Sequence, residues 1–233
     1  MPLEYDVFLV KIRALKEMGF VPGLRSGDTD VGKVLEEKLG IPENNIAGPD
    51  FEVYELKSKR RESSAMMTLF TKAPQPRGVN SVLRAKFGYP PRDGVGRHND
   101  LQVGVSFFKK NSVGLWLEYS GDRLILANER GVEAYYERDY LRRAFEKKIG
   151  ARLIYVLADA RRRGRQEEFH YNEAYLLSGF DFSSFVERLR EGVVKFDIRL
   201  GHYADGRPHD HGTGFRVLPT GIPKCFVHSE KLL

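Results

Sequence analysis

The hydrophobic residues of this chain change their spacing several times along its length, and this limits the folds open to it. Apolar residues recur at helical spacing from Tyr5 to Met18, where Gly19 interrupts them. Residues 51–59 and 64–70 instead alternate between apolar and polar positions. A spacing of three to four residues is typical of an amphipathic helix, and alternation is typical of a strand with one buried face. The chain is therefore expected to adopt a mixed α/β fold.

The same reasoning assigns the remaining elements. Asp30 is expected to cap a short helix that Gly40 and Pro42 end. No repeat or low-complexity linker divides the chain, so we expect one domain, which can be divided into two lobes that share a core. Further predicted elements are a helix or turn at 78–87, helices at 140–148 and 182–191, strands within 101–127 and at 152–158, 196–200 and 215–217, and loops at 88–99 and 201–214.

Composition excludes several classes of protein. The 41% of hydrophobic residues and the 15 Phe and 11 Tyr argue against disorder. No apolar run approaches the ~18 residues of a membrane span, and residues 1–5 lack the features of a secretory signal. Cys225 is the single cysteine, so neither an internal disulfide nor a Cys-rich metal motif is possible. Together these features predict a cytoplasmic protein.

The charge balance suits an anionic partner. Lysine and arginine outnumber the acidic residues by 38 to 32, which gives a net charge of +6. Basic clusters at 142–143, 147–148 and 161–165 are interleaved with tyrosines, which is compatible with nucleic-acid binding. Each cluster taken alone is interpreted more simply as a solvated helix face or an exposed loop.

The segment from Asp50 to Lys57 carries the strongest chemical signal. Glu55 and Lys57 are two residues apart in a predicted strand, so their side chains are expected on one face. Asp50 has the opposite parity and is expected to reach the same place from a bend after Gly48-Pro49. Two carboxylates can hold Mg²⁺, and a neighbouring lysine can orient an attacking water, a combination suited to phosphodiester hydrolysis. The alternative is an ordinary Glu–Lys pair on a half-exposed strand.

A second group of polar residues lies near the end of the chain. Arg199 and Arg216 are expected to point away from the apolar faces of two strands, and His209, Asp210 and His211 lie in the loop between them. Arginine makes paired hydrogen bonds to guanine in the major groove, and histidine can donate to the same acceptors. Two alternatives stay open, a metal site built on the two histidines and a hydrogen-bonded surface loop.

With these two groups in view, the chain resembles the MvaI/BcnI family of type II restriction endonucleases. Five stretches in the same order carry the resemblance, and they cover roughly a third of the residues. No clear match is found at 88–172. The stretches are Val31-Gly32-Lys33 with Glu36, Pro49-Asp50-Phe51 through Glu55-Leu56-Lys57, residues 68–74, Pro76-Arg77-Gly78 with Asn80, Leu83 and Arg84, and Asp197-Ile198-Arg199 through His209-Asp210-His211 to Arg216.

The resemblance implies a fold and a site. It implies a PD-(D/E)xK restriction-endonuclease-like core, related to the mismatch-repair nickase MutH, with two lobes around a DNA cleft and Mg²⁺ as cofactor. The catalytic lobe would centre on about 1–90 and the recognition elements on about 190–220. Asp50 and Glu55 would be metal ligands and Lys57 the catalytic lysine. Glu36 would support the metal or its waters, and Lys72 would approach the scissile phosphate.

The resemblance also implies a substrate. Arg199, His209, Asp210, His211 and Arg216 would contact double-stranded DNA, with Arg84 as a further candidate. Family members look like monomers that cut a short CC-N-GG type site one strand at a time, and a companion methyltransferase can act on the same site. Two other functions compete with this one: a MutH-like nickase directed by a mismatch or by methylation, and a DNA-binding module whose nuclease centre has decayed.

Overall fold

The chain is divided into two compact units. Unit 1 comprises Met1–Ala65, Lys147–Phe180 and Phe226–Leu233, and unit 2 comprises Met66–Glu146 and Asp181–Cys225. The computed structural model describes residues 3–41, 50–90, 100–149, 152–202 and 208–233, without the side chains of 202 and 208–211. The predicted mixed α/β fold is confirmed in both units, and each unit has its own core. No helix within the described ranges is both long enough and apolar enough to cross a bilayer.

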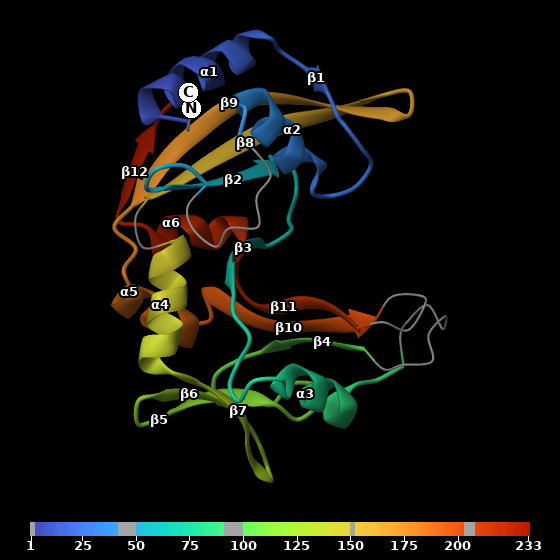
Figure 1. Ribbon diagram of the computed structural model, residues 1–233, viewed down its shortest axis with the longest axis vertical. Helices are drawn as coiled ribbons and strands as arrows, with labels where there is room; N and C mark the ends of the chain where they lie inside the picture. Colours follow the sequence, from blue (N-terminus) through green and yellow to red (C-terminus); the bar gives the residue numbers. More distant parts are fainter. Residues whose placement is uncertain (1–2, 42–49, 91–99, 150–151, 203–207) are drawn as a thin grey trace. The chain divides into compact units, whose positions relative to one another are not determined.

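Unit 1 is a five-stranded sheet with two helices. The strands follow the order β1–β9–β8–β2, and β12 pairs with β9. β2 and β8 are parallel, whereas β8 and β9 form a long antiparallel hairpin whose tip extends past the rest of the sheet (Figure 1). The elements are α1 (Tyr5–Glu17), β1 (Val21–Pro22), α2 (Asp30–Leu39), β2 (Tyr54–Arg60), β8 (Arg152–Arg163), β9 (Gln166–Ser178) and β12 (His228–Lys231).

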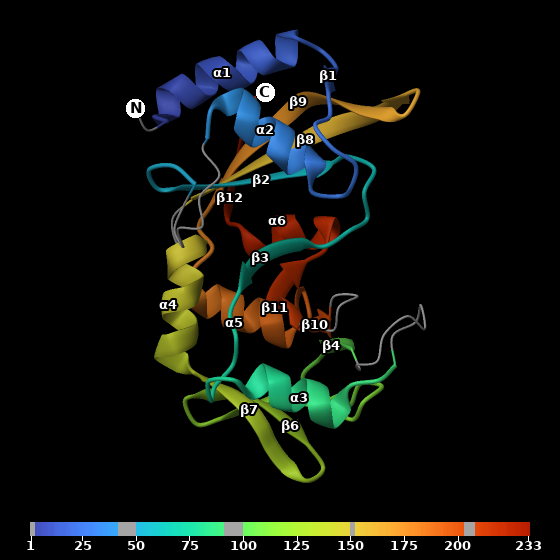
Figure 2. The ribbon, with the colours of Figure 1, turned by 45° about the vertical axis from the view of Figure 1, so that its right-hand side comes forward.

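Both helices of unit 1 cover one face of this sheet (Figures 1 and 2). α1 buries Phe8, Ile12 and Leu15, which lie at the helical spacing seen in the sequence. α2 ends at Gly40, whose φ of 74° gives the left-handed conformation that glycine adopts easily. These side chains form one apolar core with the inward faces of β2, β8 and β9.

The expected capping role of Asp30 is wrong. Thr29 occupies the N-cap position of α2, and Asp30 is the first helical residue. The Asp30 side chain is fully buried, and its Oδ1 accepts hydrogen bonds from the backbone N–H groups of Leu24 and Arg25. Asp30 therefore fixes the loop before α2 instead of the first turn of the helix.

Unit 2 contains two sheets and most of the remaining helices. A four-stranded sheet has the order β3–β11–β10–β4, and a three-stranded sheet has the order β5–β6–β7. The last two residues of α4 belong to unit 1. The elements are β3 (Met67–Thr71), α3 (Val79–Phe87), β4 (Leu101–Val105), β5 (Trp116–Ser120), β6 (Arg123–Asn128), β7 (Gly131–Glu137), α4 (Arg138–Lys148), α5 (Phe182–Arg190), β10 (Val194–His202), β11 (Pro208–Val217), η1 (Pro219–Gly221) and α6 (Ile222–Cys225).

Aromatic side chains form the core of unit 2. Phe215 of β11 stacks on Phe70 of β3 at 4.7 Å between ring centroids, and it lies edge-on to Phe185 of α5 at 5.3 Å. Phe145 of α4 lies 5.0 Å from Phe185, so both helices pack on the same face of the four-stranded sheet. Aromatic pairs at these spacings add to the stability gained by burial alone.

Several predicted boundaries differ from those observed. β8 continues through the basic residues 161–163, which the sequence indicated as an exposed loop, because Arg161–Arg163 pair with 166–168 of β9. β11 begins at Pro208, inside the segment expected to be a turn-rich loop. β7, β9 and β12 lie outside the strands predicted from the sequence.

Candidate functional site

A tight turn brings Asp50 to the start of β2. The N–H groups of Asp50 and Phe51 donate to the Tyr54 carbonyl at 3.0 and 3.3 Å, and Tyr54 donates back to the Phe51 carbonyl. Glu52 in the middle of the turn has a φ of 44°, a left-handed conformation uncommon outside glycine. The Asp50 Oδ2 accepts a hydrogen bond of 2.7 Å from the Leu56 N–H, so this carboxylate lies beside the strand that carries Glu55.

Glu55 and Lys57 lie on one face of β2, as the alternation predicted. The Lys57 Nζ is 2.6 Å from the Glu55 Oε1. Tyr54 and Leu56 point the opposite way, into the core of unit 1. The Glu55 side chain is only 1% exposed, so nearby cations, and not water, must stabilise its negative charge.

Lys148 is a second cationic partner of Glu55, and the sequence reasoning missed it as a site residue. Its Nζ lies 3.2 Å from Oε2 and 3.3 Å from Oε1 of Glu55. Lys148 is the last residue of α4 and is 93 positions away from Glu55 in sequence. The only signal in the sequence was the Lys147-Lys148 pair, which does not indicate a partner.

Lys59 is the next residue on the same face of β2. Its Nζ donates to the Ala65 carbonyl at 2.7 Å, and burial lowers the pKa of this lysine because the charged form loses hydration. Lys59 therefore ties β2 to the segment after it, whereas Lys57 and Lys148 bind the carboxylate.

The two remaining catalytic candidates lie on other elements. Glu36 is on α2, which packs against β2, and its carboxylate lies 3.7 Å from the Lys33 Nζ. Lys72 belongs to unit 2, where its Nζ lies 4.1 Å from the centre of the Tyr140 ring and its carbonyl accepts from the Tyr136 hydroxyl. Of the five candidates, the structure brings Asp50, Glu55 and Lys57 together within one turn and strand.

The donor set at this place suits a hard divalent cation. In the described part of the chain, no group of three or more His, Cys, Asp or Glu side chains is arranged to hold a metal. Asp50 and Glu55 offer two carboxylates, and Mg²⁺ is usually bound by one or two carboxylates together with waters and substrate phosphate. The residues present therefore fit Mg²⁺ shared with a phosphate better than a cation enclosed by protein ligands.

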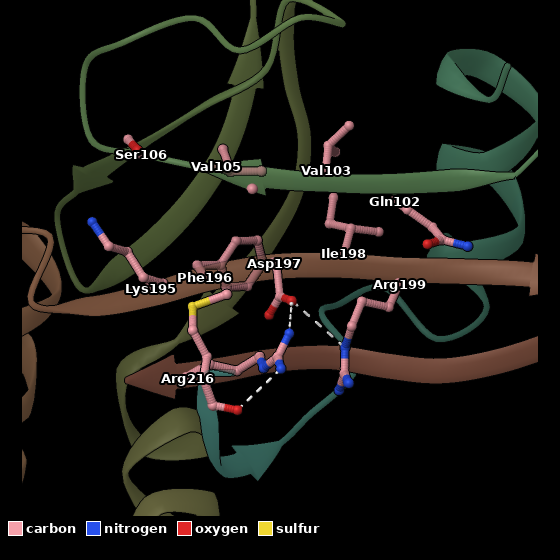
Figure 3. Close-up of a pocket in the computed structure, with 12 residues that line it drawn as sticks. Gln102, Val103, Val105, Ser106, Lys195, Phe196, Asp197, Ile198, Arg199 and Arg216 are labelled. Carbon is pink, nitrogen blue, oxygen red and sulfur yellow. Dashed lines mark hydrogen bonds and ion pairs between the residues drawn. The ribbon is translucent and has the colours of Figure 1, made fainter. Parts of the chain in front are cut away.

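A groove of about 380 Å³ lies on the four-stranded sheet of unit 2. Its lining includes Asp197 and Arg199 of β10 and Arg216 of β11 (Figure 3). The Asp197 Oδ2 accepts from the Arg216 Nη1 at 2.9 Å and lies 3.7 Å from the Arg199 Nε. A second hydrogen bond, from the Arg216 Nη2 to the Met66 carbonyl, fixes the plane of that guanidinium. Both arginines predicted from the sequence therefore share one carboxylate.

Glycines flank Asp197 on both neighbouring strands. Gly104 of β4 and Gly214 of β11 stand opposite it in the sheet. A methyl group at Gly214 would lie 3.1 Å from both the Arg199 Nη2 and the Asp197 Oδ1. The Asp197 carboxylate itself is buried beneath its two arginine partners. The Asp197 Oδ1 is buried and has no hydrogen-bond partner among the described residues.

Of the other residues predicted to contact DNA, the structure describes the side chain of Arg84. The Arg84 Nη1 donates to the Gly201 carbonyl at 2.8 Å, which holds α3 against the end of β10. The backbones of His209 and Asp210 pair with Gly201 and Leu200, but the side chains of His209, Asp210 and His211 lie outside the described residues.

A family model and two solved structures relate this chain to the same group of proteins. The model of the MvaI/BcnI restriction endonuclease family matches residues 9–226. A solved structure of restriction endonuclease MvaI in complex with cognate DNA is similar to this chain, with a TM-score of 0.85 and 26% identity over 99% of this chain and 100% of that one. A structure of MvaI without DNA has a TM-score of 0.55 and 22% identity over 100% and 99% of the two chains. No curated protein matches the chain.

Proposed function

The chain belongs to the MvaI/BcnI restriction endonuclease family, and on that premise we propose that it is a Mg²⁺-dependent endonuclease that hydrolyses double-stranded DNA at a specific site. Membership of this family identifies the chain as a restriction endonuclease, an enzyme that acts on DNA. The metal, the sequence recognised and the roles of individual residues are proposals. The site proposed is of the CC-N-GG type, cut by a monomer one strand at a time.

The observation that carries the proposal is the arrangement of Asp50, Glu55 and Lys57. The Leu56 N–H fixes the Asp50 carboxylate beside β2, and the Lys57 Nζ lies against the Glu55 carboxylate on the same strand. A DNA-binding module with a decayed nuclease centre would not need to retain two fixed carboxylates and a lysine at one place.

Asp50 and Glu55 would hold Mg²⁺, which supplies charge neutralisation at the scissile phosphate and lowers the pKa of a coordinated water. Lys57 would orient the attacking water by donating a hydrogen bond from its ammonium group, and its charge would stabilise the extra negative charge that develops on phosphorus-bound oxygens. Glu36 would accept hydrogen bonds from metal-bound waters. Lys72 would contact the phosphate backbone.

The groove of unit 2 is the proposed place of base recognition. Arg199 and Arg216 line the groove and carry donors suited to the O6 and N7 of guanine. A site of the CC-N-GG type offers guanines to both arginines. His209, Asp210 and His211 are proposed to contribute further contacts. Arg84 is proposed to position β10, because its guanidinium is bound to the Gly201 carbonyl.

Incubation of a supercoiled plasmid with the enzyme tests the proposal. We expect linear fragments in Mg²⁺, none after addition of EDTA, and fragment ends that map to one short sequence. Lys57→Ala should slow cleavage by roughly 10²- to 10⁴-fold, which is the usual contribution of a residue that positions or deprotonates the nucleophile. Lys38→Ala, on an exposed position of α2, removes the same charge and serves as the matched control.

Three outcomes would contradict the proposal. Undiminished cleavage by Lys57→Ala would remove the assigned centre. Nicked circles without linear product, formed only on mismatched or hemimethylated DNA, would indicate a MutH-like nickase. DNA binding in Ca²⁺ without cleavage in Mg²⁺ would indicate a DNA-binding module. A methyltransferase that protects the mapped site would support a complete restriction–modification pair.

A further inference from the structure

Two lysines from distant parts of the chain share one buried carboxylate. The Glu55 Oε1 lies 2.6 Å from the Lys57 Nζ and 3.3 Å from the Lys148 Nζ, and Oε2 lies 3.2 Å from Lys148. The Lys57 and Lys148 side chains are 29% and 31% exposed, whereas Glu55 is 1% exposed. Both ammonium groups are therefore partly open to water or to a ligand, whereas the Glu55 carboxylate is covered by its surroundings and by these two lysines.

The residue after Lys148 limits where this lysine can reach. Ile149, directly after the helix and in the same unit, is 2% exposed. Lys148 also stands at the C-terminus of a helix, where a positive charge is favoured by the helix dipole. Lys147, its immediate neighbour, is exposed and makes a useful comparison.

The charges of these four groups balance. Asp50 and Glu55 contribute two negative charges, and Lys57 and Lys148 contribute two positive charges. Without Lys148 the same site would carry a net charge of −1, which favours a divalent cation. With Lys148 in place, a cation at Glu55 must compete with an ammonium group for the same oxygens and is also repelled by it.

We infer that Lys148 is a positioning residue that makes metal binding at Glu55 depend on a DNA phosphate. A phosphate oxygen that enters the site offers Lys148 a new anionic partner and releases Glu55 to bind the cation. Lys148 then neutralises charge on the phosphate, while Glu55 and Asp50 hold the metal. The inference rests on the proposed function, since it assumes that the substrate brings a phosphate to this site.

The consequence is a coupling between two binding events. DNA should raise the affinity for the metal, and the metal should raise the affinity for DNA by the same factor. Removal of the Lys148 charge should therefore improve metal binding in the absence of DNA and impair cleavage in its presence. A purely structural role would weaken both together.

The test uses three variants of the full chain: Lys148→Met, Lys148→Arg and Lys147→Met. The probe is Mn²⁺ alone, titrated into DNA-free protein and followed by the electron paramagnetic resonance signal of the free ion. We expect the dissociation constant of Lys148→Met to fall roughly tenfold below that of the parent, which corresponds to about 1.4 kcal/mol. Lys148→Arg retains the charge and should bind Mn²⁺ as the parent does.

Single-turnover cleavage of plasmid at saturating Mg²⁺ is the second readout. Lys148→Met should be at least tenfold slower than the parent, because saturating metal removes any advantage of tighter binding and exposes the lost phosphate contact. Lys147→Met lowers the net charge equally and should match the parent in both measurements. Thermal melts of all variants show whether each is folded.

Two results would overturn the inference: Mn²⁺ binding by folded Lys148→Met that is equal to or weaker than that of the parent, or cleavage by this variant at the parental rate. If Lys148→Met fails to fold, Lys148→Gln takes its place in both measurements. The inference and the proposed function fail separately. A parent that cleaves no DNA refutes the function, whereas the Mn²⁺ titrations still measure whether Lys148 opposes cation binding.

Discussion

Replacement of Asp197 by alanine should lower sequence discrimination without lowering general affinity for DNA. The carboxylate accepts from the Arg216 Nη1 at 2.9 Å and lies 3.7 Å from the Arg199 Nε, so its loss removes an anionic partner from both proposed base-reading guanidinium groups. It also removes the unpartnered Oδ1 acceptor. Both arginine charges remain, and the net charge of the chain rises from +6 to +7.

The structure sets the size of the expected effect. One lost bidentate base contact costs about 1–3 kcal/mol of discrimination, or roughly 5- to 150-fold. The Arg216 Nη2 still donates to the Met66 carbonyl at 3.1 Å, so this arginine keeps part of its orientation. We therefore expect a loss in the lower half of that range, about 5- to 30-fold.

The assay compares kcat/KM for a duplex with the mapped site and for duplexes with one changed base pair. Asp139→Ala is the matched control, because Asp139 pairs with Arg142 at 3.5 Å on the exposed face of α4. Asp197→Asn retains the shape and one acceptor and should fall between parent and alanine variant. An unchanged ratio of kcat/KM values in Asp197→Ala would refute base reading in this groove, and so would weaker binding to unrelated DNA.

Three further predictions concern stability. Tyr119→Phe should leave the melting temperature unchanged or raise it, because the buried Tyr119 hydroxyl has no hydrogen-bond partner among the described residues and burial raises its pKa to about 12; a clear loss of stability would show that a partner exists. Phe215→Ala should cost about 3–5 kcal/mol in urea unfolding, since the ring is fully buried against four aromatic neighbours; Phe215→Leu should cost less, and equal losses would contradict the proposed role of the ring. The hydrogen bond from Arg60 lowers the pKa of Glu167 below its ordinary value of 4.5, so the pair stabilises the fold above that pH and the stabilisation is lost as the pH falls through the lowered pKa. The stability difference between parent and Glu167→Gln should accordingly shrink between pH 7 and pH 3, and a difference that is constant with pH would contradict it.

Local pattern was sufficient for the parts of the site that lie on one strand. A period of two placed Glu55 and Lys57 on the same face of β2, and their side chains meet at 2.6 Å. Glycine at position 40 ended α2 because a left-handed residue closes the helix. Such statements hold in any tertiary context, since they follow from backbone geometry over a few residues.

Contacts formed beyond the immediate neighbours of a residue were not predicted from the sequence. The basic run 161–163 has the composition of a loop, yet β9 supplies the hydrogen bonds that extend β8 through it. Aspartate is a common helix N-cap, yet the Asp30 carboxylate accepts hydrogen bonds from the backbone N–H groups of Leu24 and Arg25. In both cases a partner elsewhere in the chain outweighed a weak local preference.

The sequence by itself determined the mixed α/β class, the helices with clear periodicity, and the strand that carries Glu55 and Lys57 on one face. Tertiary structure alone decided which cations surround Glu55 and which arginines share Asp197. Lys148 is 93 positions away from Glu55, and Arg216 is 19 positions away from Asp197. Strand parity depends only on neighbouring residues, whereas the electrostatics of a buried carboxylate depend on every charge that folding brings to within a few ångströms of it.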